Sequence, residues 1–308
     1  MRNTPATFKG VYTAIITPFK SGKVDYSALE KLVKLQLKGG VDGIVPVGTT
    51  GESPTVSIEE HIEIIRKTVQ FANGKTKVMA GTGANSTSEA IYLTKAAEEV
   101  GADASLQVAP YYNKPTQEGL FQHFHAIARA TKLPIILYSI PGRCGIEIGI
   151  ETVHRLAQDS VNIVGIKEAG GNPDRVSQLR VALGEKFDIL CGDDSLTLPF
   201  MAVGADGVVS VASNVIPREV TQMVRAFRAG KLDAARALHS RYYGLFKDLF
   251  IETNPAPTKA ALAMMGLVEE GCRLPLVDIT AKSRARLEKT LRECGVLQRS
   301  SAKGKERS

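Results

Sequence analysis

The residues best suited to covalent chemistry stand at the ends of short apolar runs. Lys167 ends the run in IVGIK, and Tyr138 ends the run in IILY. Burial disfavours the charged form of a lysine, so an amine at such a position can become neutral and attack a carbonyl. A salt bridge between Lys167 and its neighbour Glu168 is the structural alternative. The pattern leaves both interpretations open.

Two further segments could bind an anion. The turn GTTGE at 48–52 precedes a helical segment, and its free N–H groups suit a carboxylate or phosphate. A tight, capped strand-to-helix connection would need the same residues. Arg143 in PGRCG could form two parallel hydrogen bonds to a carboxylate, although many loop arginines are only solvated. The tripeptide YYN at 111–113 fits a core, an interface or a site.

Other chemistries lack their motifs. The five histidines form no HExxH pattern, and neither GxSxG nor GxxxxGK[ST] occurs. The segment GTGANS at 81–86 lacks the third glycine of a dinucleotide loop. Asp193-Asp194 could bind a divalent ion, but no ligand cluster supports them. The four cysteines form no CxxC pair, which argues against a zinc knuckle or disulfide framework and fits a reducing compartment. We expect no metal.

The charge is concentrated at one end of the chain. The 308 residues carry a net charge of +7, and residues 281–308 hold nine basic and three acidic side chains. No aromatic residues interleave with these basic groups, so we expect no nucleic-acid partner. The start of the chain has no signal-peptide pattern, and no apolar run approaches the roughly 20 residues that span a bilayer. A soluble, cytoplasmic protein without a membrane partner is expected.

Short apolar runs alternate with amphipathic segments along most of the chain. We predict strands over 11–17, 43–48, 77–83, 104–110, 134–141, 162–169, 187–192 and 207–212. Several show little polar alternation, as in a parallel sheet covered on both faces. Eight such units predict an α/β fold, a (β/α)8 TIM barrel over residues 1–230. A doubly wound sheet is the rival fold. We expect a helical extension over 231–296 and a disordered basic tail over 297–308.

Helix-start signals support these units. Asp25 precedes the first helical segment, and Gly39-Gly40 end it. Ser57 with a glutamate three residues later forms a predicted capping box, and Ser86 with Glu89 repeats the pattern. In such a barrel, reactive groups project from the carboxyl ends of the strands, where Lys167 stands.

The motifs together resemble one enzyme family. GTTGES, GTGAN, APYYNKPTQEGL, ILYSIPGRCG, GIKEAGG, CGDD and NPAPTK occur in the order and spacing of the 4-hydroxy-tetrahydrodipicolinate synthase (dihydrodipicolinate synthase) family. The resemblance spans residues 10–296. It implies a class I aldolase barrel with a helical C-terminal extension, no cofactor, and a homotetramer built from two tight dimers.

The resemblance also implies residue roles. Lys167 matches the lysine that forms an imine with pyruvate, and Tyr138 matches the tyrosine that moves protons. Thr49 matches the hydroxyl that links this tyrosine to a second one. Tyr112 matches that second tyrosine, which reaches in from the neighbouring subunit.

The remaining roles concern the substrates. Thr49 and Thr50 match the turn that holds the pyruvate carboxylate. Arg143 matches the arginine that binds the carboxylate of L-aspartate 4-semialdehyde, and the Val209 carbonyl lines the pocket. The implied activity is condensation of these two substrates in lysine and diaminopimelate biosynthesis.

The chain departs from the family pattern near these residues. Ser139, Cys144 and Gly170 stand where other side chains are more frequent, which bears on rate and substrate range. Lysine inhibits many relatives at a site that five residues here match, namely Ser53, His61, Asn85, Glu89 and Tyr111. Ile58 and Pro54 differ from the usual residues there, so feedback inhibition stays a hypothesis.

Three rival functions remain. Another class I pyruvate lyase, such as an N-acetylneuraminate or keto-sugar-acid aldolase, would share Lys167 and Tyr138. Within the resemblance, Thr49-Thr50, YYN and Arg143 favour a small carboxylated aldehyde instead. A silent barrel used as a binding protein would not need these residues, and a metal-dependent aldolase would need ligands that the sequence lacks.

Overall fold

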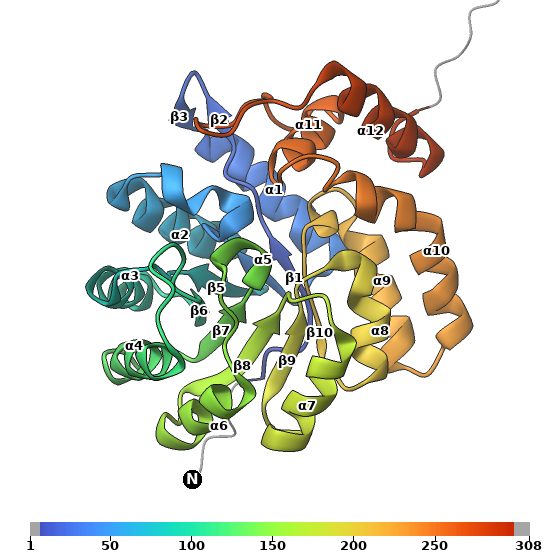
Figure 1. Ribbon diagram of the computed structural model, residues 1–308. Helices are drawn as coiled ribbons and strands as arrows, with labels where there is room; N and C mark the ends of the chain where they lie inside the picture. The colour runs from blue at the N-terminus through green and yellow to red at the C-terminus, as the bar shows by residue number, and fades with distance from the viewer. Residues whose placement is uncertain (1–6, 299–308) are drawn as a thin grey trace, which may run out of the picture.

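Eight parallel strands close into a barrel (Figure 1). The computed structural model describes residues 7–298. The sheet is closed because β1 pairs with both β4 and β10. The barrel strands are β1 (Gly10–Ala14), β4 (Gly43–Val45), β5 (Lys77–Gly81), β6 (Ala104–Val108), β7 (Ile135–Ser139), β8 (Ile163–Glu168), β9 (Asp188–Cys191) and β10 (Gly207–Ser210). The predicted (β/α)8 barrel is confirmed. Each strand ends one to three residues before its predicted end, where the chain leaves the sheet for a loop.

A ring of helices surrounds the strands. These helices are α1 (Tyr26–Gly39), α2 (Ile58–Ala72), α3 (Thr87–Glu99), α4 (Gln117–Arg129), α6 (Ile150–Asp159), α7 (Pro173–Leu183), α8 (Thr197–Ala202) and α9 (Pro217–Arg228). Two features were not predicted, because both are too short to show periodicity. They are helix α5 (Pro141–Cys144) and the hairpin of β2 (Phe19–Lys20) and β3 (Lys23–Val24).

The helix-start predictions have mixed outcomes. The Asp25 side chain accepts a hydrogen bond from the Ala28 N–H, and Gly40 ends α1 in the left-handed conformation. Ser57 and Glu60 form the predicted capping box of α2. The second box is wrong, because the Ser86 side chain caps no N–H of α3. Its hydroxyl instead lies 3.0 Å from Ser88 Oγ.

Two apolar clusters divide the core. One fills the barrel interior with alternate strand residues, including Tyr12, Met79, Ile136, Leu190 and Val209. The larger cluster packs the outward-facing strand residues against the helices. A side chain at Gly43 would collide with the interior, because its Cβ would lie 2.2 Å from the Tyr12 ring. The barrel is therefore a packed core rather than a pore.

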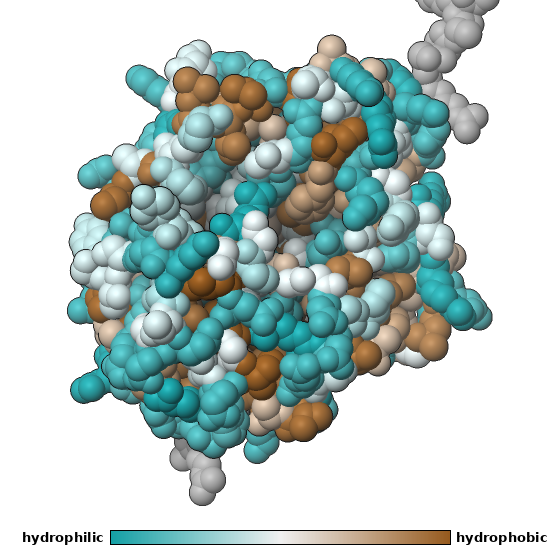
Figure 2. Space-filling model, in the orientation of Figure 1, coloured by the Kyte–Doolittle hydropathy of each residue, from teal (hydrophilic) through white to brown (hydrophobic). Residues whose placement is uncertain are grey.

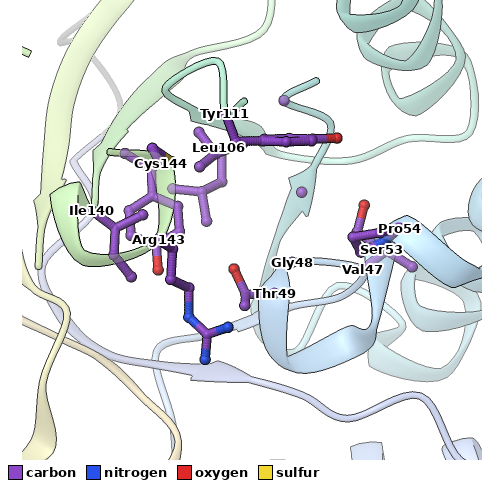
Figure 3. A pocket seen from close by; sticks show the side chains of 14 residues that line it. Val47, Gly48, Thr49, Ser53, Pro54, Leu106, Tyr111, Ile140, Arg143 and Cys144 are labelled. Atoms are coloured by element: carbon purple, nitrogen blue, oxygen red, sulfur yellow. The ribbon is translucent and has the colours of Figure 1, made fainter. Parts of the chain in front are cut away.

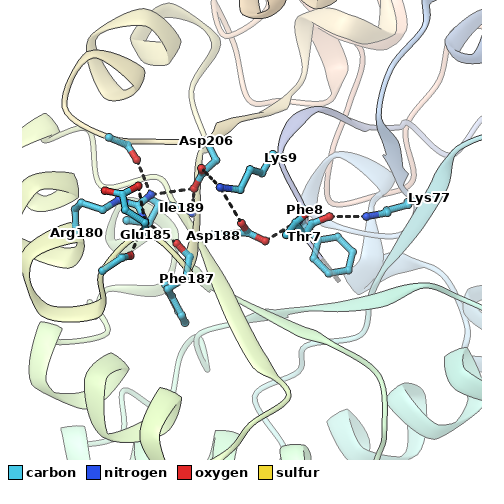
Figure 4. Close-up of polar contacts among 12 residues, drawn as sticks. Thr7, Phe8, Lys9, Lys77, Arg180, Glu185, Phe187, Asp188, Ile189 and Asp206 are labelled. Atoms are coloured by element: carbon cyan, nitrogen blue, oxygen red, sulfur yellow. Dashed lines mark hydrogen bonds and ion pairs between the residues drawn. The ribbon is translucent and has the colours of Figure 1, made fainter. Parts of the chain in front are cut away.

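Ion pairs tie the strands together at the amino end of the barrel (Figure 4). Lys9 Nζ lies 2.8 Å from an Asp206 carboxylate oxygen, and Arg180 contacts the other oxygen at 2.9 Å. Asp188 accepts a hydrogen bond from the Phe8 N–H at 2.6 Å. These contacts lie at the end opposite the cavity described below, so we assign them to stability.

In the described part of the chain, three helices follow the barrel: α10 (Leu232–Asp248), α11 (Ala256–Met264) and α12 (Ala281–Glu293). Helix α10 packs on α9, and α12 packs on both α10 and α11. In Figure 1, the segment between α11 and α12 runs beside the β2–β3 hairpin, and Lys20 Nζ lies 3.0 Å from Glu269 in that segment. The predicted tail over 297–308 falls outside the described residues from position 299 onward. None of the helices within 7–298 is long and apolar enough to cross a membrane.

Candidate active site

A cavity of about 210 Å³ opens at the carboxyl end of the barrel. It is bounded by the ends of several strands, the loops after β4 and β6, and α5. The lining residues are Val47, Gly48, Thr49, Ser53, Pro54, Gly81, Gly83, Leu106, Val108, Tyr111, Tyr138, Ile140, Arg143 and Cys144. Figure 2 shows this face hollowed near its centre, with polar and apolar side chains mixed around the hollow.

Lys167 and Tyr138 lie side by side in the barrel. Each is the penultimate residue of its strand, and the two are paired in the register of β7 and β8. The Lys167 Nζ lies 4.0 Å from the centre of the Tyr138 ring, and only 7% of Lys167 is exposed. At Gly192, a Cβ would lie 3.1 Å from Lys167 Cε, so glycine there leaves room for the lysine stem.

Glu168 points away from Lys167. Its carboxylate accepts hydrogen bonds from Arg175 Nε at 2.6 Å and from the Gly170 N–H at 2.7 Å. Burial raises the pKa of Glu168, while the Arg175 charge opposes that shift. Lys167 forms no ion pair within residues 7–298. The salt-bridge alternative for Lys167 is therefore wrong, because adjacent strand residues face opposite sides of the sheet.

The GTTGE segment contains backbone donors that no described residue accepts from. Thr49–Gly51 is a 3-10 helix, and the N–H groups of Thr49 and Thr50 at its start have no acceptor among the described residues. Thr50 is buried, and its hydroxyl accepts a hydrogen bond from Asn254 Nδ2 at 2.9 Å. These unpaired donors can receive a carboxylate.

Arg143 stands at the entrance. It projects from α5, and Figure 3 shows its guanidinium directed toward Thr49. One terminal nitrogen donates to the Asn254 carbonyl oxygen at 3.3 Å. The neighbouring Cys144 is buried, and its thiol donates to the Ala109 carbonyl at 3.2 Å. Burial raises the pKa of Cys144 to about 11, so its thiol is neutral near pH 7.

The two tyrosines of YYN have different surroundings. Tyr111 lines the cavity, and its carbonyl accepts a hydrogen bond from Asn85 Nδ2 at 3.1 Å. Tyr112 is 91% exposed, does not line the cavity, and has a φ of 74°. A tyrosine in the left-handed region is uncommon and strained.

The other predicted site residues are spread around this mouth. Ser53 lines the cavity, whereas Glu89 is exposed on α3. His61 is buried on α2, and its Nε2 lies 2.7 Å from the Gly81 carbonyl oxygen. Burial lowers the pKa of His61 to about 4. Val209 lies inside the barrel on β10, outside the cavity lining.

The acidic pair after β9 is occupied by protein groups. Asp194 accepts hydrogen bonds from Ser210 Oγ at 2.5 Å and from the N–H groups of Val211 and Ala212 at 2.9 Å. Burial raises its pKa to about 6. Asp193 accepts from the N–H and hydroxyl of Ser195. Across the described part of the chain, no three His, Cys, Asp or Glu side chains form a ligand cluster.

Two residues near the site were not singled out from the sequence. Asn254 bonds both Thr50 and Arg143, and Lys259 forms an ion pair with Glu52. Both belong to the NPAPTK stretch at 254–259. The stretch was a signal, but its contacts join residues more than one hundred positions apart in the chain.

Comparisons with known proteins identify the family of this chain. Residues 7–294 match the model of the dihydrodipicolinate synthetase family. The 4-hydroxy-tetrahydrodipicolinate synthase of Sulfurihydrogenibium sp. (strain YO3AOP1) is 52% identical over 292 residues, covering 94% of this chain and 100% of that protein.

Solved structures agree as well. The 4-hydroxy-tetrahydrodipicolinate synthase from Methylacidiphilum fumariolicum SolV superimposes with a TM-score of 0.93 at 57% identity, covering 94% of this chain and 96% of that one. The chloride-inhibited dihydrodipicolinate synthase from Acinetobacter baumannii, complexed with pyruvate, gives a TM-score of 0.92 at 46% identity, covering 94% and 100%. This chain belongs to the dihydrodipicolinate synthetase family.

Proposed function

We propose that this chain condenses pyruvate with L-aspartate 4-semialdehyde to give 4-hydroxy-tetrahydrodipicolinate, in lysine and diaminopimelate biosynthesis. The observation that carries the proposal is the position of Lys167. Its amine lies against the Tyr138 ring, at the mouth of the barrel, with no carboxylate partner in residues 7–298. The names of the similar proteins support the same reaction.

The reaction begins with an imine. The Lys167 amine attacks the keto carbon of pyruvate, and loss of water leaves a C=N bond. The imine makes the pyruvate methyl group acidic, and loss of a proton gives an enamine. The enamine carbon attacks the aldehyde carbon of the second substrate. The amine of that substrate then attacks the imine carbon, closes the ring and releases Lys167.

Hydroxyl groups move the protons in this scheme. Tyr138 is adjacent to Lys167 and lines the cavity with Thr49, so both can exchange protons with bound intermediates. We propose that Tyr112 completes this relay in a neighbouring subunit of a homotetramer. Its exposure and its strained backbone support that role, since strain persists where function requires it.

Backbone N–H donors and the Arg143 guanidinium select carboxylated substrates. The N–H groups of Thr49 and Thr50 receive the pyruvate carboxylate. Arg143 binds the carboxylate of the semialdehyde at the entrance. In this proposal the barrel of residues 1–230 performs the chemistry, and the helical extension of residues 231–296 supports it.

We also propose a lysine-binding site beside the cavity. Ser53 and Tyr111 lie on the cavity wall, Asn85 holds the Tyr111 carbonyl, and Glu89 is exposed on the adjacent helix. His61 is neutral near pH 7 and offers hydrogen bonds rather than charge. Loss of rate on titration with lysine supports this site, and an unchanged rate at saturating lysine contradicts it.

Borohydride trapping tests the proposed reaction. Incubation with pyruvate and borohydride should leave a reduced pyruvate adduct on Lys167, detected by peptide mass spectrometry, and none in Lys167→Ala. Absence of the adduct would exclude every imine-forming function. L-aspartate 4-semialdehyde should then be consumed faster than pyruvate is released from N-acetylneuraminate. The reverse order would identify another pyruvate lyase of the superfamily.

A further inference from the structure

Glu52 is a buried carboxylate two residues after Thr50 in the chain. It follows the 3-10 helix with a φ of 56°, and 1% of it is exposed. Glu52 Oε2 accepts a hydrogen bond from the Arg273 N–H at 3.0 Å. Glu52 Oε1 contacts Lys259 Nζ. The carboxylate therefore joins the turn to the segment that follows the barrel.

Lys259 lies in α11 and is as deeply buried as Glu52. Only 1% of it is exposed, its Nζ donates to the Gly271 carbonyl at 2.8 Å, and Nζ lies 4.0 Å from the centre of the Phe19 ring. Burial lowers the pKa of Lys259, and the Glu52 charge opposes that shift. Arg273 stacks on the same Phe19 ring and binds Glu60 through two nitrogens.

A second contact reaches the same turn from the same segment. Asn254 Nδ2 donates to Thr50 Oγ1, while the Asn254 carbonyl accepts from Arg143. Thr258 Oγ1 in turn donates to Asn254 Oδ1 at 3.3 Å. Residues 254–259 thus hold both groups that are assigned to substrate carboxylates, the turn through two links and Arg143 through one.

We propose that the Glu52–Lys259 ion pair is a positioning device for the pyruvate carboxylate. The inference rests on the proposed function and names two residues for which that function has no role. Lys259 cancels a negative charge two residues from Thr50, where an unpaired carboxylate would repel an incoming one. The pair also fixes the direction of the Thr49 and Thr50 N–H groups, so the turn is organised before pyruvate arrives.

The competing interpretation is that the pair only stabilises the fold. Buried ion pairs often add little net stability, although removing one partner is costly. A purely structural role predicts a lower unfolding temperature with unchanged affinity for pyruvate in the folded protein. A positioning role predicts weaker binding of pyruvate, with a smaller change for the semialdehyde.

Three variants of the full chain test the proposal. Lys259→Met removes the compensating charge, and Glu52→Gln removes the carboxylate charge while keeping an acceptor for the Arg273 N–H. Lys20→Met is the control. It also removes a lysine that pairs with a glutamate after the barrel, because Lys20 Nζ lies 3.0 Å from Glu269, but this ion pair is exposed. The readouts are the pyruvate concentration that half-saturates borohydride trapping, the KM for each substrate, and thermal unfolding.

In Lys259→Met, the half-saturating pyruvate concentration should rise about tenfold, the effect of losing roughly one charge-assisted contact. Glu52→Gln should give a smaller rise, and Lys20→Met none. A folded Lys259→Met with unchanged half-saturation overturns the inference. If Lys259→Met does not fold, unchanged half-saturation in Glu52→Gln overturns it. Failure of the parent protein to form any adduct would reject the proposed function itself, so the two failures are distinguishable.

Discussion

Lys167 and Glu168 are chain neighbours with opposite surroundings. Lys167 faces the barrel interior beside Tyr138, whereas Glu168 faces outward and binds Arg175. Arg175 also donates to the Ile148 carbonyl and contacts Glu147, so it fixes the loops after β7 and β8. Because Glu168 is fully occupied there, the Lys167 amine stays available for substrate.

This division predicts that two substitutions change the free energy of unfolding by very different amounts. Arg175→Met leaves the Glu168 carboxylate buried without its partner, so the free energy of unfolding should fall by about 3–5 kcal/mol. Lys167→Met should change it by less than about 1 kcal/mol while abolishing the pyruvate adduct. Urea unfolding followed by circular dichroism measures both. A loss below about 1 kcal/mol in Arg175→Met would contradict the role of the ion pair.

Arg143 gives a second prediction for a single residue. Its guanidinium can bind a carboxylate through two hydrogen bonds, and a lysine ammonium cannot reproduce that geometry. Arg143→Lys should therefore raise the KM for L-aspartate 4-semialdehyde by about tenfold, which corresponds to roughly 1.4 kcal/mol. Steady-state kinetics give this value. Trapping of pyruvate on Lys167 should be unchanged. A selective loss of trapping would show that Arg143 acts on pyruvate rather than on the semialdehyde.

At the scale of elements, the two helices that follow β4 and β5 begin differently. Helix α2 has a full capping box, whereas α3 begins at Ser86 without a side-chain cap. In both cases the sequence carries a serine followed three residues later by a glutamate. The pattern identifies a helix start correctly in each case, but the serine rotamer decides whether the cap forms.

This difference supplies a matched pair of variants. Ser57→Ala removes the acceptor for the Glu60 N–H and should lower the free energy of unfolding by about 1 kcal/mol. Ser86→Ala removes a hydroxyl that caps no N–H of α3, and should cost less than about 0.5 kcal/mol. Chemical denaturation of both variants checks the difference. Equal losses would show that the Ser57 cap does not stabilise the folded protein.

At the scale of the whole molecule, buried histidines make stability depend on pH. Burial lowers the pKa of both His61 and His123 to about 4, from an ordinary value of 6.5. The unfolded chain therefore binds more protons between these values. The stabilisation is complete above pH 6.5 and is lost progressively as the pH falls from 6.5 to 4. Asp194 acts in the opposite direction, because burial raises its pKa to about 6 and folding then retains a proton.

The double variant His61→Gln/His123→Gln isolates this contribution. Between about pH 7 and pH 4.5, the free energy of unfolding should fall less in the double variant than in the parent. The difference between the two falls should be about 1–3 kcal/mol for each histidine replaced. His154→Gln, on the outer helix α6, is the control and should keep the parental slope. Urea titrations at several pH values give the slopes, and a parental slope in the double variant would refute the assignment.

The sequence by itself determined the elements of this protein and the strand-end positions of Lys167 and Tyr138. Apolar runs and helix signals mark all eight units, because local periodicity records which face of each segment is buried. Lys167 and Tyr138 could be placed together, since both stand near the carboxyl ends of consecutive strands in one barrel. The motifs then carried the family resemblance.

Only the tertiary structure decided what surrounds these residues. It assigned Glu168 to Arg175, left Tyr112 outside the cavity, and joined Glu52 to Lys259 across 207 positions of the chain. Local patterns contain no record of such contacts, because they form only when the barrel closes and the C-terminal helices pack against it. The GTTGE turn is encoded within five residues, whereas the groups that hold it in place come from the C-terminal part of the chain.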